Sequence, residues 1–334
     1  MKEMRQILSR ARELRQRGES AVLATVVAVE GSAYRREGAR MLIESDGRLT
    51  GVLSGGCLER DLAERAAAVL ASGNPALATY DLRAPDEILW GLGLGCGGKI
   101  TLLLQPLSGA TDAPSPLAPF ERVARERRPG EIETRMGSEL LLREAIVPPT
   151  RLVLAGAGRD AVPLARFADE LGWETIVLDA RPTAAAQERF AGLARVAPVG
   201  PRDFAAAVTI DAYTAAIVLT HNYLDDLAWL AALLPSAAPY VGLLGPATRR
   251  DRLLADLAMQ GMALDEALRS RLHGPAGLDL GGRAPEQVAL AIVAEIQAAM
   301  TGASATALSR PRADAADAAD AASGALPPTV VHEP

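Results

Sequence analysis

The segment Leu152-Val153-Leu154-Ala155-Gly156-Ala157-Gly158-Arg159-Asp160-Ala161 decides the fold class of the second half of the chain. An apolar run followed directly by glycines and a helix-forming stretch is typical of a strand, a tight turn and a helix. Gly156 permits the turn, and Gly158 lets a pyrophosphate approach backbone N–H groups at the helix start. The small Ala161 allows the helix to pack closely on the strand. We therefore expect a Rossmann-type turn here.

Short apolar stretches alternate with helical stretches throughout residues 151–300. The expected strands are 152–155, 175–178, 194–197, 215–219 and 240–244, and a last helix should begin near Pro285. Such alternation predicts parallel βαβ units. The sequence thus predicts an α/β protein whose C-terminal domain, residues 151–300, is a Rossmann-type doubly wound parallel-sheet domain.

Asp179 follows the strand expected at 175–178. An acidic residue at about this place accepts hydrogen bonds from a ribose hydroxyl in dinucleotide-binding domains. Together with Gly156 and Gly158, it predicts a site for NAD(P) or another nucleotide. The alternative is that the two glycines serve only the packing of the helix on the strand.

The first part of the chain, residues 1–107, predicts a domain of mixed α+β type. Apolar residues recur at helical spacing over 4–14, and Gly18 follows as a stop. Strands are expected at 21–29, 41–43 and 49–53, the last two flanking an Asp46-Gly47 hairpin turn. A second helix over 58–70 and strands at 76–80 and 99–104 complete this domain.

Two further segments have a composition that differs from the domains. Six prolines fall between residues 108 and 149, around a charged stretch at 121–128. This pattern predicts a Pro-rich linker with some local structure over 108–150. Residues 301–334 are dominated by Ala, Ser, Asp and Pro, and their scarce bulky apolar content predicts a disordered tail.

The composition limits the classes of protein to consider. A chain of 334 residues, 49% apolar and 23% charged, is long enough for two domains with real cores. A net charge of -6 and a pI near 5.3 argue against a nucleic-acid or membrane-surface binder, because such binding needs a concentrated basic surface. The charged N-terminus and the lack of a stretch of ~18 apolar residues predict a cytoplasmic protein without a membrane segment.

Cys57 lies in a glycine-rich loop, after Gly55 and Gly56 and directly before an expected helix. In a reducing compartment a structural disulfide with the second cysteine, Cys96, is not expected. The dipole and free N–H groups of the helix lower a thiol pKa, which favours the thiolate as a nucleophile or soft-metal ligand. The alternative for each cysteine is a merely buried thiol in a tight turn.

Cys96 stands in the stretch 91–98, in which five of eight residues are glycine. So many glycines are costly to order unless the backbone must approach something closely. Open N–H groups in such a loop, here including Gly97 and Gly98, can hold an anion. Two such loops in one small domain favour a ligand site.

A third segment, residues 31–41, leaves a strand and carries three arginines near a turn. The guanidinium of Arg35 suits a phosphate or a carboxylate, because it binds such groups in bidentate fashion. A solvated charged turn is the alternative. The three histidines of the chain are scattered and show no zinc-type spacing.

The order of these motifs resembles the XdhC/CoxI family of maturation factors for molybdenum hydroxylases, over about residues 10–300. In the first domain the resemblance rests on Gly31-Ser32 through Arg35, on residues 38–41, on 55–59 and on 96–98. In the second domain it rests on 156–158, Thr220-His221, 240–245 and 274–279, followed by Pro285-Glu286 and Ala294-Glu295.

The resemblance implies an accessory factor rather than a catalyst. Such a protein binds molybdenum cofactor transiently, protects it while its sulfido ligand is installed, and delivers it to an apo molybdenum hydroxylase. The client is an enzyme such as xanthine dehydrogenase or a related aerobic CO dehydrogenase-type enzyme. The resemblance also implies a cysteine desulfurase as sulfur donor and a homodimer.

A pterin-phosphate that carries molybdenum needs backbone N–H groups and an arginine for its phosphate, and a soft thiolate near the metal. We therefore interpret Cys57 as the thiol that contacts the cofactor and as the metal ligand. The supporting contacts in this interpretation are Gly55, Gly56, Ser32, Arg35 and the loop of Cys96, Gly97 and Gly98.

Four positions depart from the family pattern. Ser54 stands where the family usually has a glycine, and Tyr34 where proline is common. Arg159 stands where a histidine commonly follows the Rossmann glycines, and Tyr223 where a second histidine is expected. The changes at 159 and 223 alter the predicted site in the second domain, although His221, after the strand expected at 215–219, remains suited to the crevice. Two other classes stay open: an NAD(P)-dependent oxidoreductase that uses the Gly156 turn, and a protein scaffold without bound cofactor.

Overall fold

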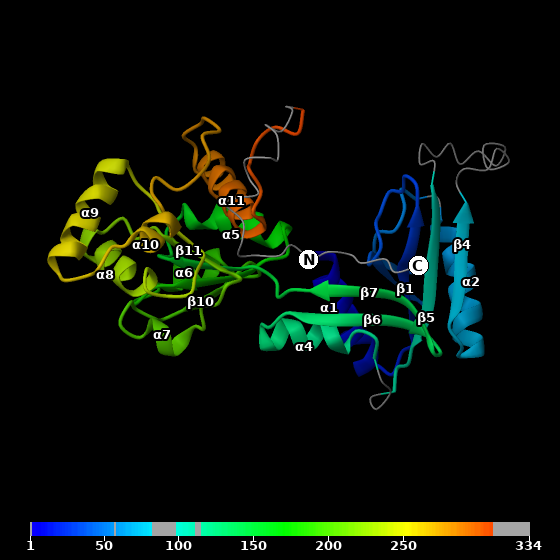
Figure 1. The fold of residues 1–334 in the computed structure, drawn as a ribbon. Helices are drawn as coiled ribbons and strands as arrows, with labels where there is room; N and C mark the ends of the chain where they lie inside the picture. The colour runs from blue at the N-terminus through cyan, green and yellow to red at the C-terminus, as the bar shows by residue number, and fades with distance from the viewer. Residues whose placement is uncertain (1, 57, 82–97, 111–114, 310–334) are drawn as a thin grey trace. The chain divides into compact units, whose positions relative to one another are not determined.

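The computed structural model describes residues 2–56, 58–81, 98–110 and 115–309, and the chain divides into two units between Pro148 and Pro149 (Figure 1). Cys57, Cys96 and Gly97 lie outside the described residues, as does most of the tail predicted over 301–334. Within the described part, no helix combines the length and apolar character needed to cross a membrane.

A five-stranded antiparallel sheet forms the centre of the first unit, in the order β3-β2-β1-β5-β4. Its strands are β1 (Ala21–Glu30), β2 (Arg40–Glu44), β3 (Leu49–Gly51), β4 (Ala76–Asp81) and β5 (Lys99–Leu107). Two helices accompany it, α1 (Lys2–Gln16) and α2 (Glu59–Ser72). Each of these elements overlaps one predicted from the apolar pattern.

Alternation along β1 places the two helices on opposite faces of this sheet. Val22, Ala24 and Val26 share a core cluster with Leu62 and other residues of α2. The intervening Leu23 packs in a second cluster, with Ile7 of α1. Because successive side chains of a strand point to opposite faces, one ten-residue strand contributes to both cores.

Residues 108–150, expected to form a linker with some local structure, contain regular elements that pack on the first unit. This stretch contains the helix α4 (Ala118–Glu126) and a hairpin of β6 (Gly130–Met136) and β7 (Glu139–Ile146). Phe120 and Ile132 are buried in the same cluster as α1, and Leu142 packs in another with two residues of the sheet. A stretch with few apolar residues among many charges resembles a linker in sequence. Its apolar side chains are nevertheless buried, because their packing partners lie far away in the chain.

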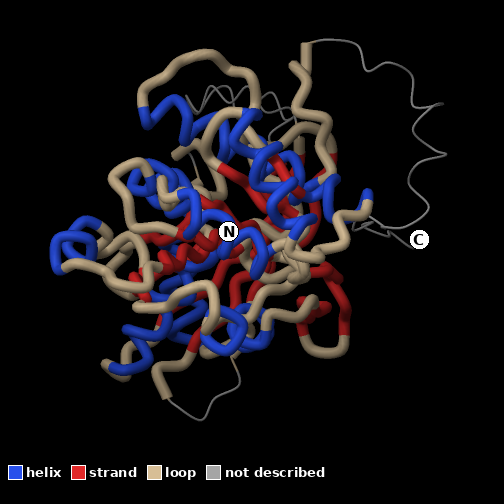
Figure 2. Tube along the Cα trace, turned by 90° about the vertical axis from the view of Figure 1, so that its left-hand side faces the viewer, coloured by secondary structure: helices blue, strands red, loops and turns tan. Residues whose placement is uncertain are grey.

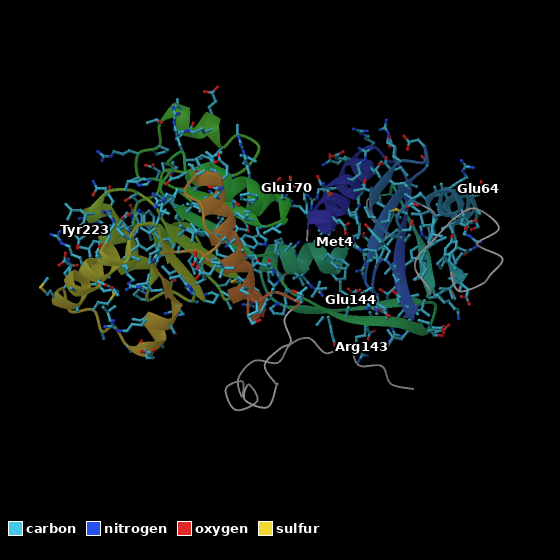
Figure 3. All side chains as sticks on the ribbon, turned by 90° about the horizontal axis from the view of Figure 1, so that it is seen from above. Met4, Glu64, Arg143, Glu144, Glu170 and Tyr223 are labelled. Atoms are coloured by element: carbon cyan, nitrogen blue, oxygen red, sulfur yellow. The ribbon has the colours of Figure 1, made fainter. Side chains whose placement is uncertain are left out.

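An ion pair joins this hairpin to the sheet of the first unit. The buried guanidinium of Arg40, on β2, contacts the carboxylate of Glu144, labelled on β7 in Figure 3. The same guanidinium lies 4.5 Å from the centre of the Phe120 ring. Residues 118–146 are therefore held on the first unit by both polar and apolar contacts.

The second unit is built on a six-stranded parallel sheet in the order β10-β9-β8-β11-β12-β13. Its strands are β8 (Arg151–Ala155), β9 (Glu174–Leu178), β10 (Arg195–Ala197), β11 (Thr214–Val218), β12 (Tyr240–Leu243) and β13 (Leu272–His273). The chain runs outward from β8 to β10 and returns to the other side of β8 at β11. This reversal is the topological switch point of a Rossmann-type sheet, so the predicted fold class is confirmed.

Helices cover both faces of the parallel sheet, and Figure 2 colours the same elements by type. They are α5 (Ala161–Glu170), α6 (Ala184–Arg189), α7 (Phe204–Ala207), α8 (Tyr223–Leu233), α9 (Ala247–Met259), α10 (Glu266–Arg271) and α11 (Pro285–Thr301). Leu152 and Leu154 pack with α5 and α11, whereas Val153 and Ala155 pack with α8 and α9. The sheet is thus doubly wound.

Candidate functional site

Three loops singled out by sequence begin at the same end of the antiparallel sheet. Glu30, the last residue of β1, and Asp81, the last of β4, both pair with Lys99, the first of β5. At the same end, β3 finishes at Gly51, opposite Met41 near the start of β2. The loops after β1, β3 and β4 therefore leave the sheet at the same end of its strands, although they are far apart in sequence.

Gly98 packs directly against the loop that carries Ser32 and Arg35. A Cβ placed on Gly98 would lie 2.4 Å from the carbonyl oxygen of Ser32 and 2.8 Å from that of Glu30. Neither distance is possible for a real side chain, so this position requires glycine. The predicted supporting residues Ser32 and Gly98 are thus brought together, whereas Cys96 and Gly97 are outside the described residues.

Ser54 and Glu59 close the loop around the position of the first cysteine. The buried hydroxyl of Ser54 donates to the Glu59 carboxylate at 2.8 Å, and it accepts from the N–H of Gly56 at 3.2 Å. Glu59 Oε2 also accepts from the N–H of Leu58 at 3.0 Å. The serine that departs from the family pattern is therefore used to order this loop.

The backbone beside Cys57 is open on the side where a side chain would stand. Gly55 and Gly56 are exposed, and a Cβ on either would contact nothing within 4 Å. Gly56 has φ 111, a conformation that favours glycine. Cys57 itself lies outside the described residues, but α2 begins at Glu59, as predicted for a helix that follows the cysteine.

Arg35 is already engaged by a carboxylate. Its Nη1 and Nη2 donate to the two oxygens of Glu3, on α1, at 2.9 and 2.5 Å. Each side chain remains about one third exposed. Sequence reasoning predicted an anion at Arg35 but missed Glu3, because the two residues are 32 positions apart. A cofactor phosphate would have to displace Glu3 to reach this guanidinium.

Replacing Glu59 with alanine should loosen the loop around Cys57. The change removes the acceptor of the Ser54 hydroxyl and of the Leu58 N–H, and hydrogen bonds to a charged group contribute about 1.5–3 kcal/mol. We expect amide hydrogen exchange at Gly56 and Leu58 to accelerate about tenfold or more. Glu64→Ala, an exposed position on the same helix, is the matched control and should leave these amides unchanged; equal protection in both variants would contradict the assignment.

In the second unit, the glycine turn packs against the residues after β11. Gly156 has φ 125, and a Cβ there would lie 2.8 Å from the carbonyl oxygen of Leu219. A Cβ on Gly158 would lie 2.5 Å from Oδ1 of Asp160. The carboxylate of Asp160 thus lies over the turn at the start of α5.

His221 holds this carboxylate. Its Nε2 lies 2.7 Å from Oδ2 of Asp160, and its φ of 60 is a left-handed conformation uncommon outside glycine. Of the predicted residues in this unit, Gly158 and His221 therefore meet around Asp160. Asp179 follows β9, and its carboxylate accepts from the N–H of Arg181 at 2.9 Å.

A buried carboxylate that sequence reasoning missed supports the loop before His221. Asp226, 1% exposed, accepts from the N–H and hydroxyl of Thr220 at 3.2 and 2.6 Å. Its second oxygen accepts from Arg249, on α9, at 3.1 and 2.6 Å. The Asp226–Arg249 pair thus fixes the backbone at Thr220, one residue before His221.

A second network fixes the loop 274–279 to α11. Glu295 accepts from the hydroxyl of Tyr240 at 2.5 Å and from the N–H of Gly277 at 2.7 Å, and it lies 3.1 Å from Nδ1 of His273. Burial and the hydrogen bond to Glu295 raise the pKa of Tyr240, so its hydroxyl remains a donor. A single acidic residue in the apolar run of α11 was the sequence signal for this network.

Potential metal ligands are dispersed over the described part of the chain. No group of three or more His, Cys, Asp or Glu side chains there could hold a metal ion. The predicted metal ligand, Cys57, is not among those residues.

Comparison with family models matches both units. Residues 152–296 match the model described as the XdhC Rossmann domain, and residues 14–81 match the model of the XdhC and CoxI family. The first match contains the glycine turn and both buried networks. The second contains Arg35 and the loop with Ser54 and Glu59.

Comparison with known proteins gives relatives that align over most of the chain. One, a Bacillus subtilis protein named as a probable xanthine dehydrogenase subunit, is 32% identical over 314 residues, which cover 83% of this chain and 92% of the relative. The molybdenum cofactor insertion chaperone PaoD of Escherichia coli is 28% identical over 87% of each chain. A crystal structure described as a xanthine dehydrogenase from Bacillus halodurans matches with a TM-score of 0.72, 28% identity, and coverage of 93% and 98%.

Proposed function

The chain belongs to the XdhC and CoxI family, and from this premise we propose that it is a maturation factor that carries molybdenum cofactor to a molybdenum hydroxylase. One observation carries the proposal. The similarity to PaoD, named as a molybdenum cofactor insertion chaperone, extends over 87% of both chains and therefore includes both units.

The end of the antiparallel sheet where the loops after β1, β3 and β4 leave its strands is the site proposed for this cargo. The exposed backbone of Gly55 and Gly56 has open space beside it, which supports the close approach of a ligand. Cys57 would supply a thiolate, a soft sulfur donor, toward molybdenum or its sulfur. Arg35 would bind the phosphate of the cargo in exchange for Glu3, its present partner.

The proposed sequence of events is binding, sulfuration and delivery. The protein holds the cofactor while a cysteine desulfurase supplies the sulfur of the sulfido ligand, and it then releases the cofactor to the apo-enzyme. The similarity to a protein named as a probable xanthine dehydrogenase subunit supports an enzyme of that class as the client. In this proposal the cargo phosphate and Glu3 compete for Arg35, and the Arg35–Glu3 contact re-forms when the cargo leaves.

The test is to purify the full chain from cells that make the cofactor and from cells that do not, and to measure bound molybdenum and oxidised-pterin fluorescence. Both signals are expected only in the first preparation, which should also activate apo xanthine dehydrogenase. A preparation without pterin would contradict the proposal. If the cofactor-free protein binds the apo-enzyme as tightly as the loaded protein does, the chain would be a scaffold. Substrate-dependent hydride transfer with NAD(P) would indicate an oxidoreductase.

A further inference from the structure

The second unit contains a cavity of about 190 Å³ between α5, α11 and the carboxyl ends of the central strands. It lies at the switch point of the sheet, where doubly wound folds bind ligands. Its walls are apolar, formed by Leu164, Ile217, Leu219, Leu244, Val288 and Ile292. An apolar cavity of about 150 Å³ accommodates benzene in another protein, so this space suits a planar ring system.

Two charged residues also line the cavity, Asp160 and Arg283. Arg283 and the neighbouring Pro285 are exposed, so the cavity opens to solvent beside them. Asp160 is about one quarter exposed, and the Nε2 of His221 holds its Oδ2. Among the described residues His221 is the hydrogen-bond partner of this carboxylate. Oδ1, which lies over Gly158, receives no hydrogen bond from the described residues and keeps its acceptor sites for a ligand.

The position of Asp160 changes what the glycine turn can bind. In dinucleotide-binding domains, a pyrophosphate lies at the helix start after the glycines, attracted by N–H groups and the helix dipole. Here a carboxylate of the chain itself lies over Gly158 at that helix start. Its negative charge repels a phosphate and attracts N–H donors. This charge disfavours a pyrophosphate at the helix start and favours a ligand that presents N–H donors there.

We infer that this cavity binds a planar heterocycle with a 2-amino-4-oxopyrimidine edge, the edge shared by pterins and guanine. The ring lies between the apolar walls, its amino and ring N–H groups donate to Asp160, and Arg283 donates to the 4-oxo group. A pterin as the natural source of this edge rests on the proposed function, since the cargo contains one. The inference adds a second binding site, in a different unit from the cysteine loops.

The test measures binding of free pterin (2-amino-4-oxopteridine), guanosine and lumazine to the full chain, by fluorescence quenching and calorimetry. Lumazine has a carbonyl in place of the 2-amino group and should bind at least about tenfold more weakly than pterin, because a donor to a carboxylate is lost. Tighter binding of pterin assigns the cofactor ring as the source, and tighter binding of guanosine assigns guanine. Binding of neither, or binding of NADP with Asp160 intact, would overturn the inference.

Variants locate the ligand within the second unit. Asp160→Asn should weaken pterin binding about tenfold or more, because it removes the charge but keeps the shape. Val288→Phe should abolish binding by filling the cavity, whereas Leu290→Phe, exposed on the same helix, is the matched control. Circular dichroism checks that both phenylalanine variants are folded. Unchanged binding by a folded Val288→Phe would place the ligand elsewhere and overturn the inference.

Activation of the apo-enzyme, measured in parallel, separates this inference from the proposed function. If wild-type protein activates the enzyme but binds none of the free heterocycles, only the cavity assignment fails. If the protein binds pterin in a manner that depends on Asp160 but neither carries cofactor nor activates the enzyme, only the proposed function fails.

Discussion

Cys57→Ala is expected to lower the molybdenum and oxidised pterin carried by the purified protein by at least about tenfold. Changes to groups that merely support a metal ligand typically cost roughly 10- to 100-fold in affinity, and the loss of the ligand itself should cost no less. Activation of apo xanthine dehydrogenase should fall in parallel. Both quantities are measured on protein from the same cofactor-producing cells.

Three further variants make the result specific to the Cys57 thiolate. Cys57→Ser keeps the size of the side chain but replaces a soft ligand with a hard one, so it should behave like Cys57→Ala. Cys96→Ala removes the other thiol and should have a smaller effect, because that loop is assigned a supporting role. Glu64→Ala, on the exposed face of α2, should carry as much cofactor as wild type. A Cys57→Ala protein that carries as much cofactor as wild type would contradict the proposed role of this residue.

Arg249→Met is expected to destabilise the second unit by about 3–5 kcal/mol, because it leaves the buried carboxylate of Asp226 without its cation. The Thr220 contacts remain, but they do not neutralise the charge. Urea unfolding followed by tryptophan fluorescence, to which Trp229, buried on α8 in the same core, contributes, measures the effect. Because Asp226 fixes Thr220, the contact between His221 and Asp160 should also loosen.

Arg252 offers a matched control for this prediction. Both arginines lie on α9 and approach the ring of Tyr223, labelled in Figure 3, at 5.5 Å for Arg249 and 5.1 Å for Arg252. Of the two, Arg249 is the one that contacts Asp226, so Arg252→Met should change stability by no more than about 0.5 kcal/mol. The double variant Arg249→Met/Asp226→Asn should recover part of the loss. Equal effects of the two single arginine changes would show that the ion pair with Asp226 is not the cause.

The Arg35–Glu3 pair shows why a correct residue type does not by itself identify a ligand. A guanidinium beside a turn predicts an anion from its chemistry, and the structure does place an anion there. That anion is a carboxylate of α1, which no pattern near Arg35 indicates. The phosphate assigned to Arg35 consequently becomes a competitor in the proposed mechanism.

The Asp160–His221 contact also joins residues that are far apart in sequence, and it changes which ligand the second unit could bind. Glycine spacing alone favoured a pyrophosphate at the Gly156 turn, since the spacing describes only the backbone. In the structure, His221 holds the carboxylate of Asp160 from 61 positions away, and this carboxylate makes the charge at the start of α5 negative. The ligand class inferred for the cavity depends on that charge.

The amino-acid sequence by itself determined five strands of the second unit, β8 to β12, and the α/β alternation typical of a Rossmann-type domain, whereas β13 (Leu272–His273) and the strand order came from the structure. Local rules suffice there, because apolar periodicity and the glycine turn after β8 are properties of neighbouring residues. Only the tertiary structure decided that residues 118–146 pack on the first unit, that Glu3 occupies Arg35, and that Asp160 and His221 meet beside the cavity. Each of these depends on residues distant in sequence, whose proximity is set by the packing of whole elements.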